Sequence, residues 1–276
     1  IKNDIAIYAI HTALDNSFEG VNHQICEEIG LVNRQILVPQ PHTIKKLVAH
    51  VPKTHIDQVR TALFEAGAGS IGNYDDCSFN IEGEGTFKAN DNANPTLGEI
   101  GKLHTEKEIQ LHLTYAKHTE SKVLKALFET HPYEEVAYEL TTLENKNQQI
   151  GIGMIGELPE AQSAEDFLLQ LKEIFQLKVI RHSKLIDKNI KKVAVLGGSG
   201  AFAIGNAKAM NADIYITADL KYHDFYQAEN QIILADIGHY ESEQYTKNLL
   251  HSYLTKKFRN FAVVLSQKST NPIQYS

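Results

Sequence analysis

The sequence contains only two cysteines, carries no excess of positive charge, and has no long hydrophobic run. Cys26 and Cys77 lie far apart and form no Cys-x-x-Cys pair, which argues against a thiolate metal site. No apolar stretch reaches the roughly 18 to 20 residues that a bilayer-spanning helix needs. The formal net charge of −7 argues against a nucleic-acid surface, which is normally basic. We therefore expect a soluble, cytoplasmic protein without membrane or nucleic-acid partners.

Length and composition leave room for more than one domain. The chain has 276 residues, of which 42% are hydrophobic, and this is enough to bury a sizeable core. It starts with Ile1 rather than Met, directly ahead of a strand-like run. We therefore expect that the natural protein has a further N-terminal segment.

A histidine and a glutamate follow a strand-like run in the last third of the chain. Residues 231–237 are almost all apolar, and Gly238 comes directly before His239. If a helix starts near Gly238, the i,i+4 spacing places His239 and Glu243 on one helical face. In α/β proteins the carboxyl end of a strand is where ligands bind. A histidine at a strand end can equally be a hydrogen-bonded structural residue.

The start of the chain repeats this arrangement. Residues 4–10 are strand-like, and His11 and Asp15 follow them at the same spacing. Two strand ends thus each offer a nitrogen and an oxygen ligand. Such ligands suit Zn, Mn, Fe or Co.

Two more strand-like runs end in polar or glycine-rich residues. Residues 192–196 lead into the Gly-Gly-Ser-Gly sequence 197–200 and a helix, and residues 213–217 lead into Asp219 and His223. A glycine-rich turn can hold an anion, but tight packing of strand and helix explains the glycines equally well. A parallel sheet would bring these strand ends together at one edge.

The middle of the chain alternates differently and predicts an inserted domain. We place this domain at residues 47–149, between two parts of an outer fold at residues 1–46 and 150–276. Its order is strand, helix, strand, strand, helix, strand, as in a ferredoxin-like α+β sandwich. The predicted elements lie at residues 47–52, 55–66, 77–87, 108–115 and 121–130 and within 131–140.

Some residues of this domain allow both a functional and a structural interpretation. His131, Glu134 and Glu135 resemble a ligand cluster, but Pro132 breaks helical geometry and favours a turn from helix to strand. Several glycines match no phosphate-binding pattern and favour tight turns. These glycines are Gly67, Gly69, Gly83 and Gly85.

Five motifs in order carry a resemblance to a known family. They are His11-Thr12-Ala13-Leu14-Asp15 with Gly20-Val21-Asn22, the run 151–158, the glycines 197–200, the run 217–224, and Gly238-His239-Tyr240-Glu241-Ser242-Glu243. With them the chain resembles the NIF3-like (DUF34) proteins, often named GTP cyclohydrolase 1 type 2 homologs. The insert resembles the PII- or CutA-like domain of the longer members. The resemblance implies an α/β fold, a NIF3-like three-layer sandwich with an inserted α+β ferredoxin-like domain.

The resemblance also implies a metal centre with two divalent ions per subunit, Zn, Fe, Mn or Co. Asp15, His239 and Glu243 are the implied ligands. His11, Asp219 and His223 are the implied contacts to these ligands or to substrate. The family also uses a His-His pair from an N-terminal segment, and this sequence has no adjacent histidines. It has Ala218 where the family usually has glycine, which should not remove a ligand.

Two functions follow from this resemblance. The first is a metal-dependent hydrolase that acts on a nucleotide or phosphoester, with His223 as the candidate proton donor to the leaving group. The alternative is a non-catalytic metal-binding regulatory protein that senses a small ligand through the PII-like insert. The resemblance further implies a homohexamer.

Overall fold

The computed structural model describes residues 2–276 and divides the chain into two compact units. The first unit contains Ile1–Gln40 and Gln148–Ser276, and the second is Pro41–Asn147. The boundary expected after residue 46 falls inside strand β2 (Ile44–Pro52). This strand pairs along its whole length with other strands of the second unit, so the unit begins before it.

The first unit is built around a six-stranded mixed sheet. The strands follow the order β1-β6-β8-β9-β10-β7, and β8, β9 and β10 run parallel to one another. The strands are β1 (Val32–Pro39), β6 (Gly151–Gln162), β7 (Arg181–His182), β8 (Ile190–Ser199), β9 (Ile214–Ala218) and β10 (Ile233–Asp236). The helical segments are α1 (Thr12–Asp15), α2 (Val21–Ile29), α5 (Ala164–Ile174), η2 (Ala201–Ala203), α6 (Ile204–Ala209), η3 (Tyr222–Ala228), α7 (His239–Glu243) and α8 (Thr246–Lys257).

Helices cover both faces of this sheet. On β8, Val193 and Val195 pack into one hydrophobic cluster with side chains of α2 and α5. The alternating residues Ala194 and Leu196 pack into a second cluster with η2 and α6. Successive side chains of a strand point to opposite faces, so the continuous apolar run of β8 serves two cores at once. The first unit therefore has three layers.

The strand expected at residues 4–10 is not present. This segment has no regular secondary structure, and Ile5, Ile7 and Tyr8 are largely exposed. A strand needs a neighbour for its backbone N–H and C=O groups, and no strand among residues 2–276 pairs with it. An apolar alternation alone therefore did not make a strand here.

Strand β1 was missed by the sequence analysis. It pairs antiparallel with β6, from Val32 opposite Glu157 to Pro39 opposite Gly151. Its first residues, Val32, Asn33 and Arg34, are mostly exposed, and the pairing is irregular at this end. The alternation that marks a strand is therefore obscured where β1 begins.

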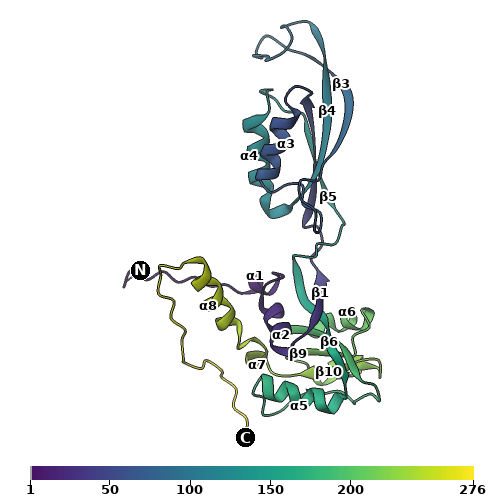
Figure 1. The fold of residues 1–276 in the computed structure, drawn as a ribbon, viewed down its shortest axis with the longest axis vertical. Helices are drawn as coiled ribbons and strands as arrows, with labels where there is room; N and C mark the ends of the chain where they lie inside the picture. Colours follow the sequence, from purple (N-terminus) through teal and green to yellow (C-terminus); the bar gives the residue numbers. More distant parts are fainter. Residues whose placement is uncertain (1) are drawn as a thin grey trace. The chain divides into compact units, whose positions relative to one another are not determined.

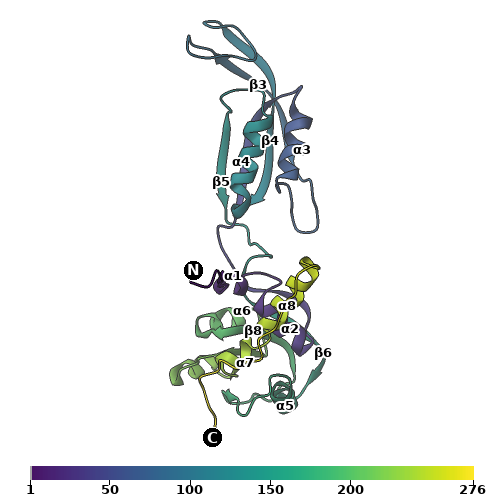
Figure 2. The same cartoon turned by 90° about the vertical axis from the view of Figure 1, so that its left-hand side faces the viewer.

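The second unit has the predicted element order. It consists of β2 (Ile44–Pro52), α3 (Ile56–Glu65), β3 (Phe79–Lys88), β4 (Leu103–Ala116), η1 (Lys117–Thr119), α4 (Glu120–Thr130) and β5 (Tyr138–Leu143). The four strands form an antiparallel sheet in the order β3-β4-β2-β5. Helices α3 and α4 lie side by side on one face of this sheet (Figures 1 and 2). One hydrophobic cluster joins the helices to the sheet.

In the second unit, His131 and two of the glycines have structural roles in turns, as the sequence favoured. His131 ends α4 and is buried, and its Nε2 lies 2.9 Å from the carbonyl oxygen of His50. Its Nδ1 accepts a hydrogen bond from the Tyr133 N–H, so both ring nitrogens have backbone partners. Gly67 and Gly69 have φ angles of 96° and 87°, which only glycine adopts readily.

No helix among residues 2–276 combines the length and apolar character that a bilayer span requires. The longest α-helix, α8, has 12 residues and none of them is buried.

Asp213 joins the starts of β8 and β9. Its Oδ2 accepts hydrogen bonds from the Lys191 and Lys192 N–H groups, and its Oδ1 pairs with Lys188. Burial by itself raises the pKa of Asp213, but these bonds outweigh it and hold the pKa below its usual value of 3.8. The folded state thus favours the charged form, and its stabilising effect is lost as pH falls below about 3.8.

We predict that Asp213→Asn lowers the free energy of unfolding by about 1–3 kcal/mol near neutral pH, because it weakens three bonds to a buried group. The difference from the natural chain should shrink as the pH falls through the aspartate range. Urea denaturation at several pH values measures both effects. Asp187→Asn, at an exposed position of the same region, is the matched control. An Asp213→Asn effect that is independent of pH would contradict the assignment.

Candidate metal centre

The parallel strands β8, β9 and β10 deliver three segments to one edge of the sheet. Gly198 lies near the end of β8, Asp219 follows β9 directly, and His239 begins helix α7 shortly after β10. These strands are adjacent and run in the same direction, so their carboxyl ends meet. The predicted gathering of these strand ends is confirmed. The fourth expected strand end, before His11, is absent because residues 4–10 form no strand.

Helix α7 stacks His239 and Glu243 as the spacing predicted. Gly238 is its N-terminal cap, and His239 Nε2 lies 3.7 Å from Glu243 Oε1. The other ring nitrogen, Nδ1, lies 2.7 Å from Asp219 Oδ2. A carboxylate bonded to one imidazole nitrogen orients the ring and leaves the other nitrogen available. Here the available nitrogen is Nε2, on the side of Glu243.

The backbone turns sharply at Asp219. Its φ angle is 58°, in the left-handed region that Asp tolerates better than most residues. Ala218 before it is the last residue of β9, is fully buried and has no positive φ. Alanine therefore fits this turn, which directs Asp219 to His239.

Asn22 connects the segment of Asp15 to the sheet. Its Nδ2 donates to the Asp15 carbonyl oxygen at 3.1 Å, and its Oδ1 accepts from the Gly197 N–H at 2.9 Å. Asn22 is buried in helix α2, which ends at Gly30 with a left-handed φ of 81°. A single buried amide thus fixes the short helix α1 against the end of β8.

Glycine at position 198 makes room for the α7 side chains. A Cβ there would lie 2.6 Å from Glu243 Oε1 and 3.2 Å from His239 Nε2. The Gly198 N–H donates to Ser242 Oγ at 2.9 Å, and this hydroxyl donates to the His239 carbonyl oxygen. The Gly197 and Gly198 amides are therefore engaged by side chains. Close packing explains these glycines, and the anion-binding alternative does not.

The cluster brings together more negative than positive charge. Burial raises the pKa of Asp15, and His11 and His239 oppose this. Burial likewise raises the pKa of Glu243; His239 opposes the increase, and Asp15 adds to it. The bond to Asp219 raises the pKa of His239, burial opposes it, and Glu243 and Asp15 reinforce it. Each of these groups thus lies within electrostatic reach of the others.

The donor set suits a divalent cation in its chemistry. Half-buried carboxylates that are short of positive charge, beside an oriented imidazole, are the groups that bind Zn, Fe, Mn or Co. Among residues 2–276, however, no three such groups converge closely enough to hold a metal ion. Asp15, His239 and Glu243 therefore form one electrostatic cluster without the convergence of a finished site.

The structure places five of the six expected site residues in this cluster. His11 caps α1 and acts on the charges of Asp15 and Glu243. The sixth residue, His223, lies on η3, where its ring contacts Tyr222 and Tyr226 at centroid distances of 5.2 and 6.3 Å.

Sequence reasoning missed the roles of Asn22 and Ser242. Both lie inside motifs that drew attention for other residues, and both act by bonding backbone amides of β8. Ser242 could be noticed only because it lies within the motif Gly238–Glu243, and its neighbours in the sequence do not indicate its distant partner, Gly198.

Comparisons with known proteins match the whole chain. The family model described as Duf34/NIF3 (NGG1p interacting factor 3) matches residues 1–272. The GTP cyclohydrolase 1 type 2 homolog of Bacillus subtilis (strain 168) is 38% identical over 281 residues, which are 100% of this chain and 75% of that protein. The protein of that name from Listeria innocua serovar 6a is 32% identical over 287 residues, with coverage of 100% and 75%.

Solved structures agree with these relatives. The crystal structure of a Bacillus cereus protein related to NIF3 has a TM-score of 0.84 and 38% identity, covering 100% of this chain and 75% of that one. The structure of Staphylococcus aureus protein SA1388 has a TM-score of 0.72 and 26% identity, with coverage of 100% and 74%.

We predict that Asp219→Asn lowers the pKa of His239 in metal-free protein, because the amide removes the charge that stabilises the imidazolium. In the natural chain this pKa should lie above its usual value of 6.5. An NMR titration of the His239 ring protons measures both. Asp224→Asn, on η3, serves as the control for a lost carboxylate. An unchanged His239 titration in Asp219→Asn would show that the contact does not set its charge.

Proposed function

Because the chain belongs to the Duf34/NIF3 family, we propose that it is a metal-dependent hydrolase whose cations are held by Asp15, His239 and Glu243. The observation that carries the proposal is the excess of half-buried carboxylate charge around one oriented imidazole. A bound divalent ion would neutralise this charge and lower the pKa of a bound water. It would also polarise the substrate group that is attacked, either a phosphoryl group or a carbon of a heterocyclic ring.

The protein's own residues have separate roles in this proposal. Asp219 holds His239 by Nδ1, so that Nε2 faces the proposed metal position. Asn22 and Ser242 fix the backbone at Gly197 and Gly198, against which Glu243 rests. His11, which lies within electrostatic reach of Asp15, is proposed to contact the substrate.

The proposed substrate is a nucleotide or another phosphoester. Support comes from the relatives, which are named GTP cyclohydrolase 1 type 2 homologs, and from the anionic character of phosphate, which a divalent cation recognises. His223 is the proposed proton donor to the leaving group, and its ring contacts Tyr222 and Tyr226.

We also propose that residues 41–147 are an inserted domain of the PII or CutA type. The order β2-α3-β3-β4-α4-β5 and the strand order β3-β4-β2-β5 support this, because together they describe a ferredoxin-like sandwich. In the alternative function the metal centre is not catalytic, and this domain senses a small ligand.

Metal content tests the proposal first. We expect the chain, stripped with a chelator and reloaded with Zn, Mn, Fe(II) or Co, to retain bound metal. Asp15→Asn and Glu243→Gln should each retain much less, because each removes a charged ligand. Elemental analysis after gel filtration measures retention, and Glu173→Gln, at an exposed position on α5, is the matched control. Retention that is equal in all four proteins would contradict the assignment of these ligands.

Turnover then separates the hydrolase from the regulatory alternative. With metal bound, the protein should hydrolyse GTP or bis-p-nitrophenyl phosphate. Asp219→Asn should weaken metal affinity roughly 10- to 100-fold, because it removes the carboxylate that orients His239. Chromatography and absorbance measure the product formed from each member of a panel of nucleotides and phosphodiesters. Tight metal binding without any product would reject the hydrolase and favour the regulatory function.

A further inference from the structure

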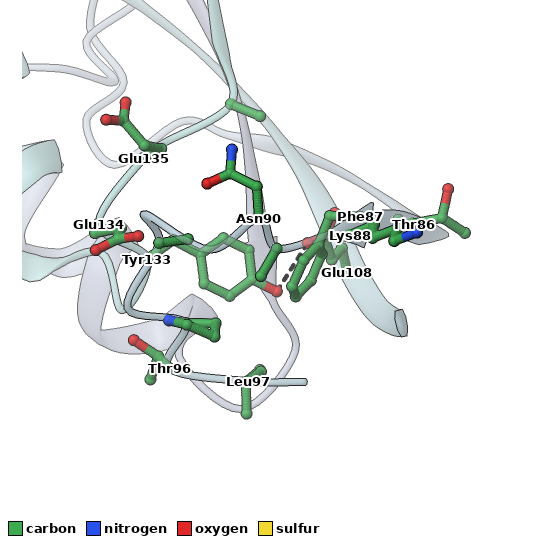
Figure 3. A pocket seen from close by; sticks show the side chains of 15 residues that line it. Thr86, Phe87, Lys88, Asn90, Thr96, Leu97, Glu108, Tyr133, Glu134 and Glu135 are labelled. Atoms are coloured by element: carbon green, nitrogen blue, oxygen red, sulfur yellow. Dashed lines mark hydrogen bonds between the residues drawn. The ribbon is translucent and has the colours of Figure 1, made fainter. Parts of the chain in front are cut away.

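The second unit contains a cavity of about 300 Å³ at the C-terminal end of strand β3. Its walls come from the end of β3, the loop 89–97, the middle of β4 and the turn after His131 (Figure 3). This volume lies at the lower end of the range for small-molecule sites. The cavity belongs entirely to residues 41–147, so it is separate from the proposed metal centre.

Hydrogen bonds hold the loop over the cavity in place. The Asn94 N–H donates to Glu134 Oε1 at 2.9 Å, and Thr96 Oγ1 donates to the Pro132 carbonyl oxygen at 2.7 Å. Both bonds join the loop to the turn after α4, although about 40 residues separate them in the chain. The cavity is therefore formed by segments that are tied to each other.

Glu108 is the buried charged group of this cavity. Its exposed fraction is 9%, and its Oε1 accepts a hydrogen bond from the Tyr133 hydroxyl at 3.0 Å (Figure 3). In the part of the chain that the structure describes, no Lys, Arg or His forms an ion pair with it. Its second oxygen, Oε2, lies beside Gly85, where a Cβ would approach to 2.2 Å. Glycine at position 85 thus leaves room for the carboxylate.

The nearest histidine does not neutralise Glu108. His131 stacks against Tyr133 at a centroid distance of 5.1 Å, and both its ring nitrogens have backbone partners. Burial lowers its pKa, so the ring stays neutral near neutral pH, although Glu108 opposes this. A buried carboxylate with a single neutral hydrogen-bond donor is costly unless a cation joins it.

One side of the cavity is apolar and aromatic, and the polar residues Thr86, Lys88, Asn90, Thr96, Glu134 and Glu135 line the rest. Phe87 and Tyr133 meet edge to face at a centroid distance of 5.6 Å, and Ala93, Pro95 and Leu97 complete an apolar side. Aromatic faces beside a carboxylate attract organic cations rather than hydrated metal ions. Among residues 2–276 no three His, Cys, Asp or Glu side chains converge closely enough to hold a metal ion, and this includes Glu108, Glu134 and Glu135.

We propose that this cavity binds a small organic cation, an ammonium or guanidinium group on an apolar or aromatic body. The cationic head pairs with Glu108, and the body lies against Phe87, Tyr133 and the apolar loop residues. Glu134 and Glu135 also line the cavity and, together with Glu108, outnumber its one cationic side chain, Lys88, so the cavity favours a cation. This gives residues 41–147 a ligand class of their own, whether or not the first unit is a hydrolase.

Binding of benzylamine to the 276-residue chain tests the proposal, with benzyl alcohol as the neutral ligand of the same shape. We expect benzylamine to shift the backbone amide NMR signals of residues 86–90 and 133–135 with saturation, and benzyl alcohol to bind at least tenfold more weakly. Glu108→Gln keeps an acceptor for Tyr133 but removes the charge, so it should weaken benzylamine binding at least tenfold. Glu84→Gln, on an exposed part of β3, should leave it unchanged.

Gly85→Ala provides an independent variant, because its φ is not in the left-handed region and its methyl fills the space beside Glu108 Oε2. Because this methyl must displace the Glu108 carboxylate, it should abolish benzylamine binding while the NMR spectrum shows that the chain remains folded. The proposal is overturned if Glu108→Gln binds benzylamine as tightly as the natural chain does. It is also overturned if MgCl₂ or ZnCl₂ alone displaces the amine, or if benzylamine, benzylguanidine and phenethylamine all fail to bind.

Discussion

The first unit depends on the close approach of helix α7 to the end of strand β8. This approach is possible because position 198 has no side chain, and it is fixed because Ser242 and Asn22 bond the amides of β8. A backbone amide that is buried at a strand end must find a partner. Here the partners are side chains of two helices, and the same bonds therefore position His239 and Glu243 against the sheet.

That arrangement concentrates charge. The bonds that place α7 and α1 near one another also bring Asp15 and Glu243 into a partly buried region, where burial raises the pKa of both carboxyl groups and Asp15 further raises that of Glu243. His239 and His11 oppose this only in part. A protein that holds like charges together in this way gains most from a cation, which is why the cluster supports metal binding more directly than any single residue does.

The second unit deals with a buried charge in a different way. Glu108 faces a cavity with aromatic walls, and one tyrosine hydroxyl bonds it. In the first unit several carboxylates surround one imidazole, which suits a metal ion. In the second a single carboxylate lies among apolar groups, which suits an organic cation. The two units thus combine similar residue types with different surroundings, and the surroundings decide the ligand chemistry.

Features that depend on neighbouring residues could be predicted from the sequence. The period of the apolar runs predicted β8, β9 and β10, the i,i+4 spacing predicted that His239 and Glu243 stack, and the element order predicted the second unit's sheet and helices. Only the tertiary structure decided the rest. Folding left residues 4–10 without a strand partner and engaged the glycine amides of β8 with Asn22 and Ser242. Periodicity depends on neighbours in the chain, whereas pairing, burial and charge depend on segments that folding brings together from far apart.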